Sequence, residues 1–457
     1  MNRESFLTEP LGKLIGKNAV PAVASMLFMA LYQIIDGIMV GRRLGPEALA
    51  SVNLLYPVIA LLVGLAVMLG VGGNARIAIL LGEGNSYRAS RVLGLILVLG
   101  LGLGMVGSFL SVLLMPNILS FLGTSGELGA QAGQYLRGMS PYLAFMIAIF
   151  ILEQSVRNDG QPNLASGVMA AAAVLNIALD YLFLYVLDYG IRGAGMATGI
   201  SQSLGALVFI VYFIGKTYRK EEGLCFAKPD GSVGTGKTIV INGASEFFNS
   251  LAMGVVTFLI NRSILMHIGG LGVAAFTLVQ YVMVVGVMII TGIGNGTQPV
   301  FSYNHGAGLS GRVQGTLWRT LMIGTAVGGA LFMLMSWQMK LIAELFLPGQ
   351  PEAVSLTLEA ASYLRWTMWF MPTAILGSIY FTALEQASKS LAIAISKGLL
   401  LPVAGLMLFP LWLGADGIWV ALVATDALAV IVVLICYGFQ MVDNKGKTNL
   451  NLSKTIL

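Results

Sequence analysis

The sequence predicts an all-α polytopic membrane protein, with twelve transmembrane helices in two six-helix lobes around a central cleft. Composition is the first reason, since 57% of the 457 residues are hydrophobic and 10% are charged. Soluble chains carry about 25% charged residues, so a soluble α/β enzyme is disfavoured. A series of long apolar segments is the second reason, and a repeat that relates the two halves of the chain is the third.

Twelve segments are apolar over the length that crosses a bilayer, which is about 20 residues. We expect them near residues 17–40, 51–80, 92–115, 135–156, 163–187, 193–215, 238–262, 272–300, 317–346, 361–385, 390–413 and 417–440. Lysine and arginine gather at the N-terminus, in the even-numbered loops and in the C-terminal tail. Because cytoplasmic loops are enriched in these residues, both termini of this plasma or inner membrane protein are expected in the cytoplasm. The net charge of +5 therefore calls for no nucleic-acid partner.

The longest polar stretch, 216–237, lies between the sixth and seventh spans. It separates an N-terminal lobe, 1–215, from a C-terminal lobe with a cytoplasmic tail, 238–457. A shift of 224 residues superimposes parts of the two halves, including Gly82, Gly84 and Arg88 on Gly306, Gly308 and Arg312. Each copy has six spans, an even number, so both have the same orientation. Parallel repeats of this kind are typical of alternating-access transporters.

The segment GSVGTGKT at 231–238 has the spacing of a phosphate-binding loop. Such a loop needs a buried strand before it and a helix after it, inside a parallel-sheet domain. Here a charged linker precedes the segment and a membrane span follows it. We therefore interpret it as a glycine-rich hinge between the lobes, with no nucleotide site.

Four polar residues on three spans are expected at similar depth in the extracellular half of the membrane: Asp36, Asn176, Asp180 and Thr198. Asn176 and Asp180 are four residues apart, which places them on one helix face. A carboxylate inside a span costs about 2.5 kcal/mol or more at mid-helix, so it indicates a function. Two neighbouring carboxylates share a proton or hold a cation between them. These oxygen donors suit sodium as well as protons, and a hydrogen-bonded helix clamp is the alternative.

Other polar and aromatic residues are candidates for lining the cleft, although each could instead serve in packing: Tyr32, Gln33, Glu246, Gln280, Gln298 and Trp366. Pro21 lies early in the first span, where the missing backbone N–H can kink a helix, so we predict a hinge there. Glu153 and Glu385 occupy equivalent positions of the repeat. They are expected to form structural ion pairs with the nearby Arg157 and Lys389.

These segments resemble the multidrug and toxic compound extrusion (MATE) family, of the bacterial or archaeal type, over essentially the whole chain. The resemblance rests on Pro21, on YQIIDGIMVG at 32–41, on NIALD at 176–180 and on GIRGAGMATGISQ at 190–202. It implies a monomer with a V-shaped pair of lobes that exports amphipathic, often cationic compounds against proton or sodium entry. No cofactor other than the coupling ion is implied. The family's cation site falls on Asp36, Asn176, Asp180 and Thr198.

One residue departs from the family pattern, and two other functions compete with antiport. Tyr181 stands where family members often have proline, which predicts a different local helix geometry.

A lipid-linked saccharide flippase of the same superfamily would need buried arginines for a pyrophosphate, and the candidates Arg76, Arg137 and Arg365 lie near span ends. A channel or receptor is disfavoured by the two-lobe repeat and by the paired acids.

Overall fold

The computed structural model describes residues 3–122, 126–347 and 349–456, and every regular element in these ranges is a helix. Eleven helices in this described part are long and apolar enough to cross a membrane. The remaining long helix, α15 (Pro351–Ala383), coincides with the expected tenth span. The predicted all-α membrane fold is confirmed, and its twelve long helices are consistent with the predicted spans.

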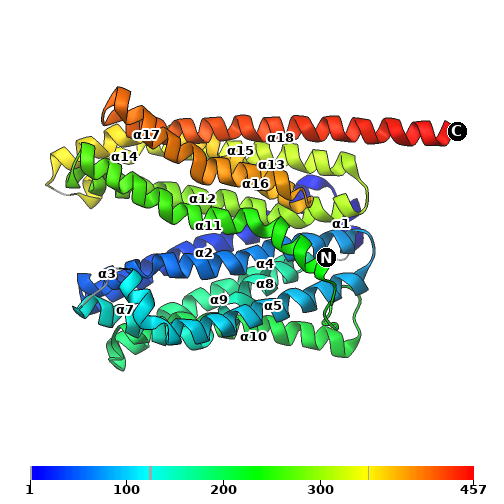
Figure 1. Cartoon of the computed structure of the whole chain (residues 1–457), viewed down its shortest axis with the longest axis horizontal. Helices are drawn as coiled ribbons and strands as arrows, with labels where there is room; N and C mark the ends of the chain where they lie inside the picture. Colours follow the sequence, from blue (N-terminus) through cyan, green and yellow to red (C-terminus); the bar gives the residue numbers. More distant parts are fainter. Residues whose placement is uncertain (1–2, 123–125, 348, 457) are drawn as a thin grey trace. The chain divides into compact units, whose positions relative to one another are not determined.

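The first half of the chain forms helices α1 to α10, in the order seen in Figure 1. Their bounds are α1 Arg3–Thr8, α2 Leu11–Leu44, α3 Pro46–Leu54, α4 Tyr56–Gly82, α5 Ser86–Leu113, α6 Met115–Phe121, α7 Gly126–Met139, α8 Leu143–Asn158, α9 Pro162–Tyr181 and α10 Gly190–Arg219. A 3-10 turn, η1 (Ser140–Tyr142), joins α7 to α8, and a π-helical turn, η2 (Leu182–Val186), continues α9.

The second half forms α11 to α18 and repeats this pattern of long helices with short interruptions. Their bounds are α11 Val233–His267, α12 Gly270–Gly306, α13 Ser310–Trp337, α14 Met339–Phe346, α15 Pro351–Ala383, α16 Ala387–Ile395, α17 Leu401–Leu413 and α18 Asp416–Ile456. A second π-helical turn, η3 (Ser396–Leu400), joins α16 to α17.

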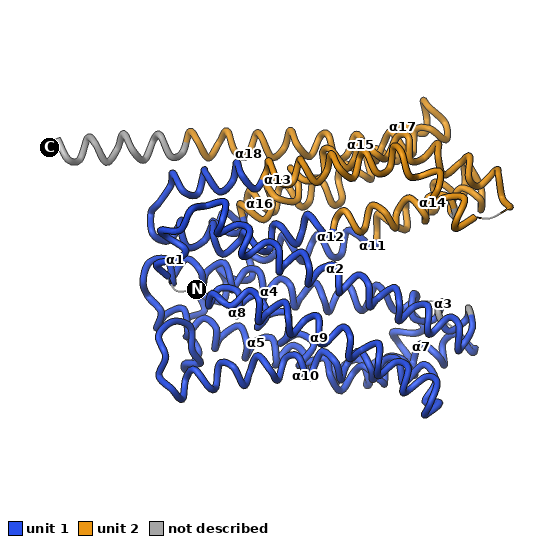
Figure 2. The backbone as a smooth tube through the Cα atoms, turned by 180° about the vertical axis from the view of Figure 1, so that it is seen from behind, with its two compact units in different colours: residues 1–254, 288–320, 382–387 blue, residues 255–287, 321–381, 388–457 orange. Residues whose placement is uncertain are grey.

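The chain folds into two compact units, coloured separately in Figure 2. Unit 1 comprises residues 1–254, 288–320 and 382–387, and unit 2 comprises 255–287, 321–381 and 388–457. Unit 1 therefore contains all of the first half, the first part of α11, the last part of α12 and the start of α13. One apolar core of unit 1 is formed by α4, α5, α8, α9 and α10, and a second by the ends of α2, α7 and α10.

Glycines bring α4 into backbone contact with α11 and α12 inside unit 1. A Cβ atom on Gly72 would lie 2.2 Å from the carbonyl oxygen of Ile239. A Cβ atom on Gly243 would lie 2.0 Å from the carbonyl oxygen of Met68, and one on Gly82 would lie 2.2 Å from that of Tyr303. Small residues permit this close approach of membrane helices. A helix of the first half is thereby packed directly against two helices of the second half.

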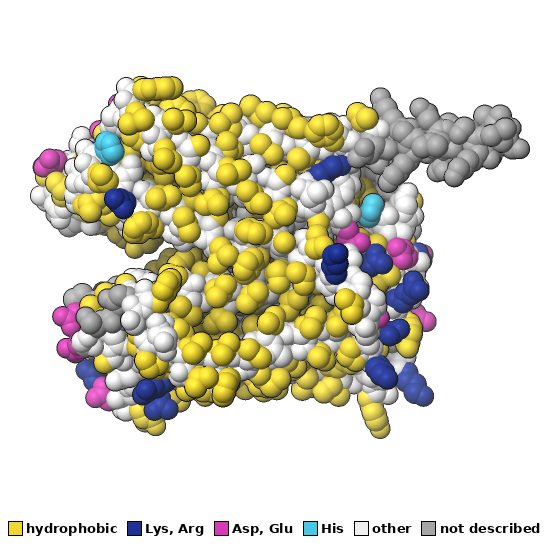
Figure 3. Space-filling model, viewed as in Figure 1, with side chains coloured by type: hydrophobic (Ala, Val, Ile, Leu, Met, Phe, Trp, Pro, Cys, Tyr) yellow, Lys and Arg dark blue, Asp and Glu magenta, His cyan; other side chains and the backbone are white. Residues whose placement is uncertain are grey.

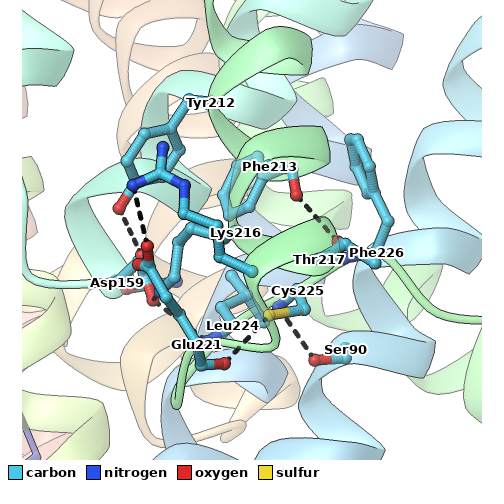
Figure 4. Close-up of polar contacts among 12 residues, drawn as sticks. Ser90, Asp159, Tyr212, Phe213, Lys216, Thr217, Glu221, Leu224, Cys225 and Phe226 are labelled. Carbon is cyan, nitrogen blue, oxygen red and sulfur yellow. Dashed lines mark hydrogen bonds and ion pairs between the residues drawn. The ribbon is translucent and has the colours of Figure 1, made fainter.

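The linker between α10 and α11 is attached to α5 and to the end of α8, as Figure 4 shows. The Asp159 carboxylate accepts hydrogen bonds from Lys216 Nζ at 2.6 Å and from the backbone N–H of Leu224 at 3.0 Å. The N–H of Cys225 donates to Ser90 Oγ at 3.1 Å. The expected glycine-rich hinge is wrong in its extent, because residues 233–238 already belong to the first turns of α11.

The surface of unit 1 has the charge distribution of a membrane protein. On the face shown in Figure 3, hydrophobic side chains cover the middle of its helices. Lysine and arginine side chains gather at the end where the N-terminus lies. This pattern matches a belt of apolar surface in contact with lipid and a basic end in contact with water.

Candidate cation site

Three helices of unit 1 carry the four residues that the sequence singles out. Asp36 lies on α2, Asn176 and Asp180 lie on α9, and Thr198 lies on α10. Helix α9 packs against both α2 and α10. Proline at the start of α9 suits its first turn, whose N–H groups have no helical partner. At the other end the helix passes into the π-helical turn η2 directly after Tyr181, the residue that departs from the family pattern.

Small residues of α10 let this helix approach its neighbours at the level of Thr198. A Cβ atom on Gly195 would lie 2.4 Å from the carbonyl oxygen of Tyr135 on α7. A Cβ atom on Gly193 would lie 2.8 Å from Cβ of Phe183 in η2. The glycine and alanine residues of the segment 190–202 therefore position Thr198 close to α9 and α7.

The carboxyl groups of Asp36 and Asp180 are near neighbours and interact with each other. Asp180 is fully buried in the protein, and Asp36 is partly buried. Two carboxyl groups come together in this way when one of them carries a proton, or when a cation lies between them. The Oδ1 atom of each acid is buried and receives no hydrogen bond from the described residues. These two oxygens can therefore accept a donor or coordinate a cation.

Asn176 connects the acid pair to Thr198. With its amide nitrogen toward Asp180, Asn176 donates to Asp180 Oδ2 at 3.3 Å and accepts from the backbone N–H of Thr198 at 3.2 Å. With the amide reversed, its nitrogen donates to Thr198 Oγ1 at 3.4 Å. The first arrangement satisfies both ends of the amide. All four predicted residues therefore form one connected group of oxygen and nitrogen atoms.

Three further polar residues adjoin this group, and the sequence analysis did not assign them to it together. Tyr135 on α7 makes a side-chain hydrogen bond with Thr198. Gln202, one turn along α10, donates to the Tyr32 hydroxyl at 3.4 Å. Tyr32, Asn176, Ser201 and Gln202 also line a cavity of about 10 Å³, together with apolar side chains such as Met29 and Phe150. This volume suits about one water molecule. Of Tyr135, Gln202 and Tyr32, the sequence singled out only Tyr32, as a candidate cleft residue.

The remaining candidate cleft residues do not gather in one place within a unit. In unit 1, Gln298 is buried and donates to the carbonyl oxygen of Val71 at 3.4 Å, while Glu246 lies on α11 and hydrogen-bonds Asn249. Gln33 is exposed on α2. In unit 2, Trp366 is 46% exposed and packs edge-on against Phe332, and Gln280 lies on α12.

The predicted hinge residue Pro21 lies inside α2, and its surroundings are polar. Its carbonyl oxygen accepts hydrogen bonds from Ser25 Oγ at 3.1 Å and from Ser166 Oγ, on α9, at 2.6 Å. Ser25 in turn accepts a hydrogen bond from Arg157 Nη2 at 3.1 Å. The proline segment is therefore attached to α8 and α9.

The expected ion pairs are correct for one acid and wrong for the other. Glu153 pairs with Arg157, and both side chains are buried. Glu385 pairs with Arg76 at 3.1 Å, and not with Lys389 as expected. Its backbone has φ 55 in the turn that precedes α16, which directs the side chain toward α4. In unit 2, Lys397 and Asp426 form a further pair at 3.1 Å.

The donor set limits what the four-residue group can bind. The described residues contain no cluster of three or more His, Cys, Asp or Glu side chains of the kind that holds a transition metal. Two carboxyl groups, an amide and a hydroxyl are hard oxygen donors, which suit a proton or a sodium ion. The group therefore offers oxygen donors that can hold a proton or a hard cation such as sodium.

Comparison with known proteins decides the family. The MatE family model matches residues 21–182 and 247–411, which is most of the chain. The chain belongs to the MATE family. Members of this family are transporters, so the protein is a multi-pass membrane transporter and not an enzyme.

Relatives and solved structures agree with this assignment. The MATE chain is 29% identical to the multidrug export protein MepA of Staphylococcus aureus (strain MSSA476) over 321 residues, 69% of each protein. It is 30% identical to MepA of Staphylococcus saprophyticus over 294 residues, 63% of each protein. A multidrug resistance MATE family transporter in an outward-facing conformation has a TM-score of 0.89 and 25% identity, covering 96% of this chain and 98% of that chain. A MATE crystal structure in complex with MaL6 has a TM-score of 0.90 at 24% identity, which supports the fold alone.

Proposed function

We propose that this MATE protein is a secondary antiporter that exports amphipathic, often cationic drugs or toxins in exchange for protons or sodium ions. The observation that carries the proposal is the contact between the carboxyl groups of Asp36 and Asp180 on membrane helices. Buried intramembrane acids are costly and indicate a binding function for a cation or a proton. The names of the relatives, which are multidrug export proteins, supply the substrate class.

In this proposal the coupling cation binds at Asp36, Asn176, Asp180 and Thr198, and these residues are the metal ligands if the ion is sodium. Coupling requires that the cation and the drug each bind one conformation of the transporter better than the other. A cation between Asp36 and Asp180 would hold α2 against α9, because it removes the repulsion between two carboxylates. Loss of the cation would favour separation of the two acids. Cation binding would therefore act by changing the position of α2 relative to α9.

The alternating-access part of the proposal concerns two lobes, residues 1–215 and 238–457, joined by the linker 216–237. Drugs would bind in the cleft between the lobes, with Tyr32, Gln33, Glu246, Gln280, Gln298 and Trp366 as candidate contacts. Pro21 would serve as the hinge of α2. The hydrogen bonds of its carbonyl group to Ser25 and Ser166 support this role, since they give the segment partners outside the helical ladder.

We place the transporter in the plasma or inner membrane as a monomer, in contact with lipid, with both termini in the cytoplasm. The basic end of unit 1 in Figure 3 supports this orientation, because cytoplasmic segments are rich in lysine and arginine. The flippase alternative gains little support. Arg76, one of its three candidate arginines, is already paired with Glu385, and Arg365 lies over the Phe332 ring at 5.3 Å.

The experiment that tests the proposal measures ethidium efflux from cells that produce the transporter. Asp36→Asn and Asp180→Asn each remove one ionisable group with little change of shape, and each is expected to abolish efflux above the background of cells without the transporter. Glu47→Gln is the control, because Glu47 is an exposed acid just beyond the end of α2. Expression is checked by immunoblotting of membranes. Efflux that continues unchanged in both aspartate variants would overturn the proposal.

A further inference from the structure

The short helix α1 has contacts that the proposed transport cycle does not yet explain. Its first residue, Arg3, lies at the end of α4. Arg3 Nε donates to the carbonyl oxygen of Leu81 at 3.1 Å, and Arg3 Nη2 donates to that of Gly82 at 2.8 Å. Carbonyl groups at the end of a helix lack helical partners and carry the negative end of its dipole. The guanidinium group therefore caps α4.

Phe6, in the middle of α1, attaches the helix to α12. Its side chain is fully buried and stacks on the Tyr303 ring, with centroids 4.3 Å apart and an interplanar angle of 11°. The Tyr303 hydroxyl donates to the carbonyl oxygen of Asn158, at the end of α8, at 2.7 Å. A six-residue helix has no core of its own, and Phe6 is the buried side chain of α1, so this stacking contact anchors the helix.

The end of α1 is held by α12 and α13. Arg312 Nη2 donates to the carbonyl oxygen of Phe6 at 3.2 Å and to that of Glu9 at 2.8 Å. Asn304 Nδ2 donates to the same Phe6 oxygen at 3.2 Å, and its Oδ1 accepts from Arg312 Nε at 2.8 Å. Helix α1 is thus bound at its start to a helix of the first half and at its end to two helices of the second half, all within unit 1.

We propose that α1 is a latch that holds the cytoplasmic ends of α4 and α12 together and that must leave one of them when the cytoplasmic side opens. The proposal rests on the alternating access proposed above, since opening toward the cytoplasm requires α4 to separate from α12. The glycine contacts between these helices lie beside α1: a Cβ atom on Gly306 would lie 2.1 Å from the carbonyl oxygen of Ile79. A backbone contact this close closes the route for water while the latch is in place.

Release of the latch would expose polar groups that form hydrogen bonds, and an apolar side chain that is buried, only while α1 is bound. The carbonyl groups of Leu81 and Gly82 would lose the Arg3 guanidinium, and Phe6 would become exposed to water. The latch therefore favours the closed cytoplasmic side. Weakening either contact shifts the equilibrium toward the open side, even without a change in the cation site.

The test uses a cysteine reporter between α4 and α12. Val71 on α4 is 6% exposed, and its carbonyl oxygen accepts a hydrogen bond from Gln298 on α12. Val71→Cys is made with Cys225→Ser and Cys436→Ala, and this triple variant is the parent. Inside-out membrane vesicles are treated with a membrane-impermeant maleimide, with and without ethidium, and the labelling rate is measured. Phe6→Ala and Arg3→Gln are then added singly, with Glu4→Gln as the matched control, because Glu4 is exposed on the same helix.

The latch predicts that Phe6→Ala and Arg3→Gln raise the labelling rate several-fold and that Glu4→Gln leaves it at the parent value. A second reporter, Ala148→Cys in the apolar core of unit 1, detects unfolding. It must stay unlabelled for a faster rate to count as release of the latch, and labelling of both reporters would contradict the proposal. If the parent is labelled in the presence of ethidium but the two α1 variants match it, the latch is wrong and alternating access stands. If the Val71→Cys reporter reacts in no variant, both proposals fail.

Discussion

The carboxyl group of Asp36 on α2 adjoins that of Asp180 on α9, so two acids from different membrane helices are brought together. A pair of this kind titrates as a unit, and its first proton is held by both residues. Its two Oδ1 atoms are buried without a hydrogen-bond donor among the described residues, and the Asn176 amide lies beside Asp180.

Asn176 and Thr198 are expected to tune the affinity of the site without carrying its charge. Asn176→Ala removes the amide that contacts Asp180. Thr198→Ala removes the hydroxyl that lies beside the Asn176 amide. Each neutral hydrogen bond contributes about 0.5–1.5 kcal/mol. We therefore expect a reduction of efflux by roughly threefold to tenfold, and not its loss. Efflux is measured as a function of the imposed cation gradient, and the deficit should shrink at a steeper gradient. Complete loss of efflux in Thr198→Ala, at normal expression, would contradict the prediction that this residue only tunes the affinity.

Arg157 is expected to be essential for stability, because it is buried beside Glu153 and Ser25. Arg157→Met leaves the Glu153 carboxylate without its cation, which costs about 3–5 kcal/mol in buried pairs. The double variant Glu153→Leu/Arg157→Met removes both charges. It should recover most of the loss, which thermal unfolding in detergent measures. A double variant that is less stable than Arg157→Met would show that the ion pair does not explain the effect.

The packing of α4 on α11 is expected to tolerate no side chain at Gly243. A Cβ atom there would lie 2.0 Å from the carbonyl oxygen of Met68, whereas one on Gly254 of the same helix would meet nothing within 4 Å. Gly243→Ala should therefore lower the free energy of unfolding by about 1–3 kcal/mol. Gly254→Ala is the matched control and should be neutral or slightly stabilising. Equal unfolding temperatures for the two variants would contradict the backbone contact.

The linker gives a prediction that depends on pH. Burial raises the pKa of the Cys225 thiol above its ordinary value, although the neighbouring Lys216 opposes the shift. Only the thiolate reacts with iodoacetamide, so alkylation at neutral pH should be slow. It should rise about tenfold per pH unit until the pH exceeds the raised pKa. The rate is measured in a Cys436→Ala background as a function of pH.

Release of the linker should shift that pH profile in a known direction. Ser90→Ala removes the hydroxyl that accepts a hydrogen bond from the N–H of Cys225. The segment should then become more hydrated, which lowers the pKa of the thiol and moves the profile to lower pH. Glu222→Gln, an exposed change in the same linker, is the control. A parent profile centred below the ordinary thiol pKa would contradict the docked linker.

Much of the fold, and the grouping of the four candidate residues, could be predicted from the sequence, because the signals are local. Length and apolarity define the spans, and the four-residue spacing of Asn176 and Asp180 places both on one face of α9. The direction and length of the sixth span placed Thr198 at the same depth as the other three residues. These signals depend on helix periodicity, which the sequence carries directly.

The contacts that the sequence did not predict join distant parts of the chain. Glu385 lies near Lys389 in sequence, yet it pairs with Arg76, which is 309 positions away. Tyr135 reaches Thr198 because Gly195 lets α10 approach α7, and no periodic pattern indicates that crossing. Helix α1 has six residues, so neither its length nor its apolarity predicted that Phe6 would be buried on Tyr303.

The most direct test of the central claim is ethidium transport by the purified protein in liposomes, driven by an imposed proton gradient or an imposed sodium gradient, one at a time. We predict that at least one of these gradients drives ethidium movement against its concentration gradient, and that Asp36→Asn and Asp180→Asn abolish this coupling while the Glu47→Gln control retains it. If sodium alone is effective, the Asp36–Asp180 pair is a metal-ion site, and if protons alone are effective, it is a shared-proton pair. Ethidium movement that needs neither gradient, or that survives in both aspartate variants, would contradict the account.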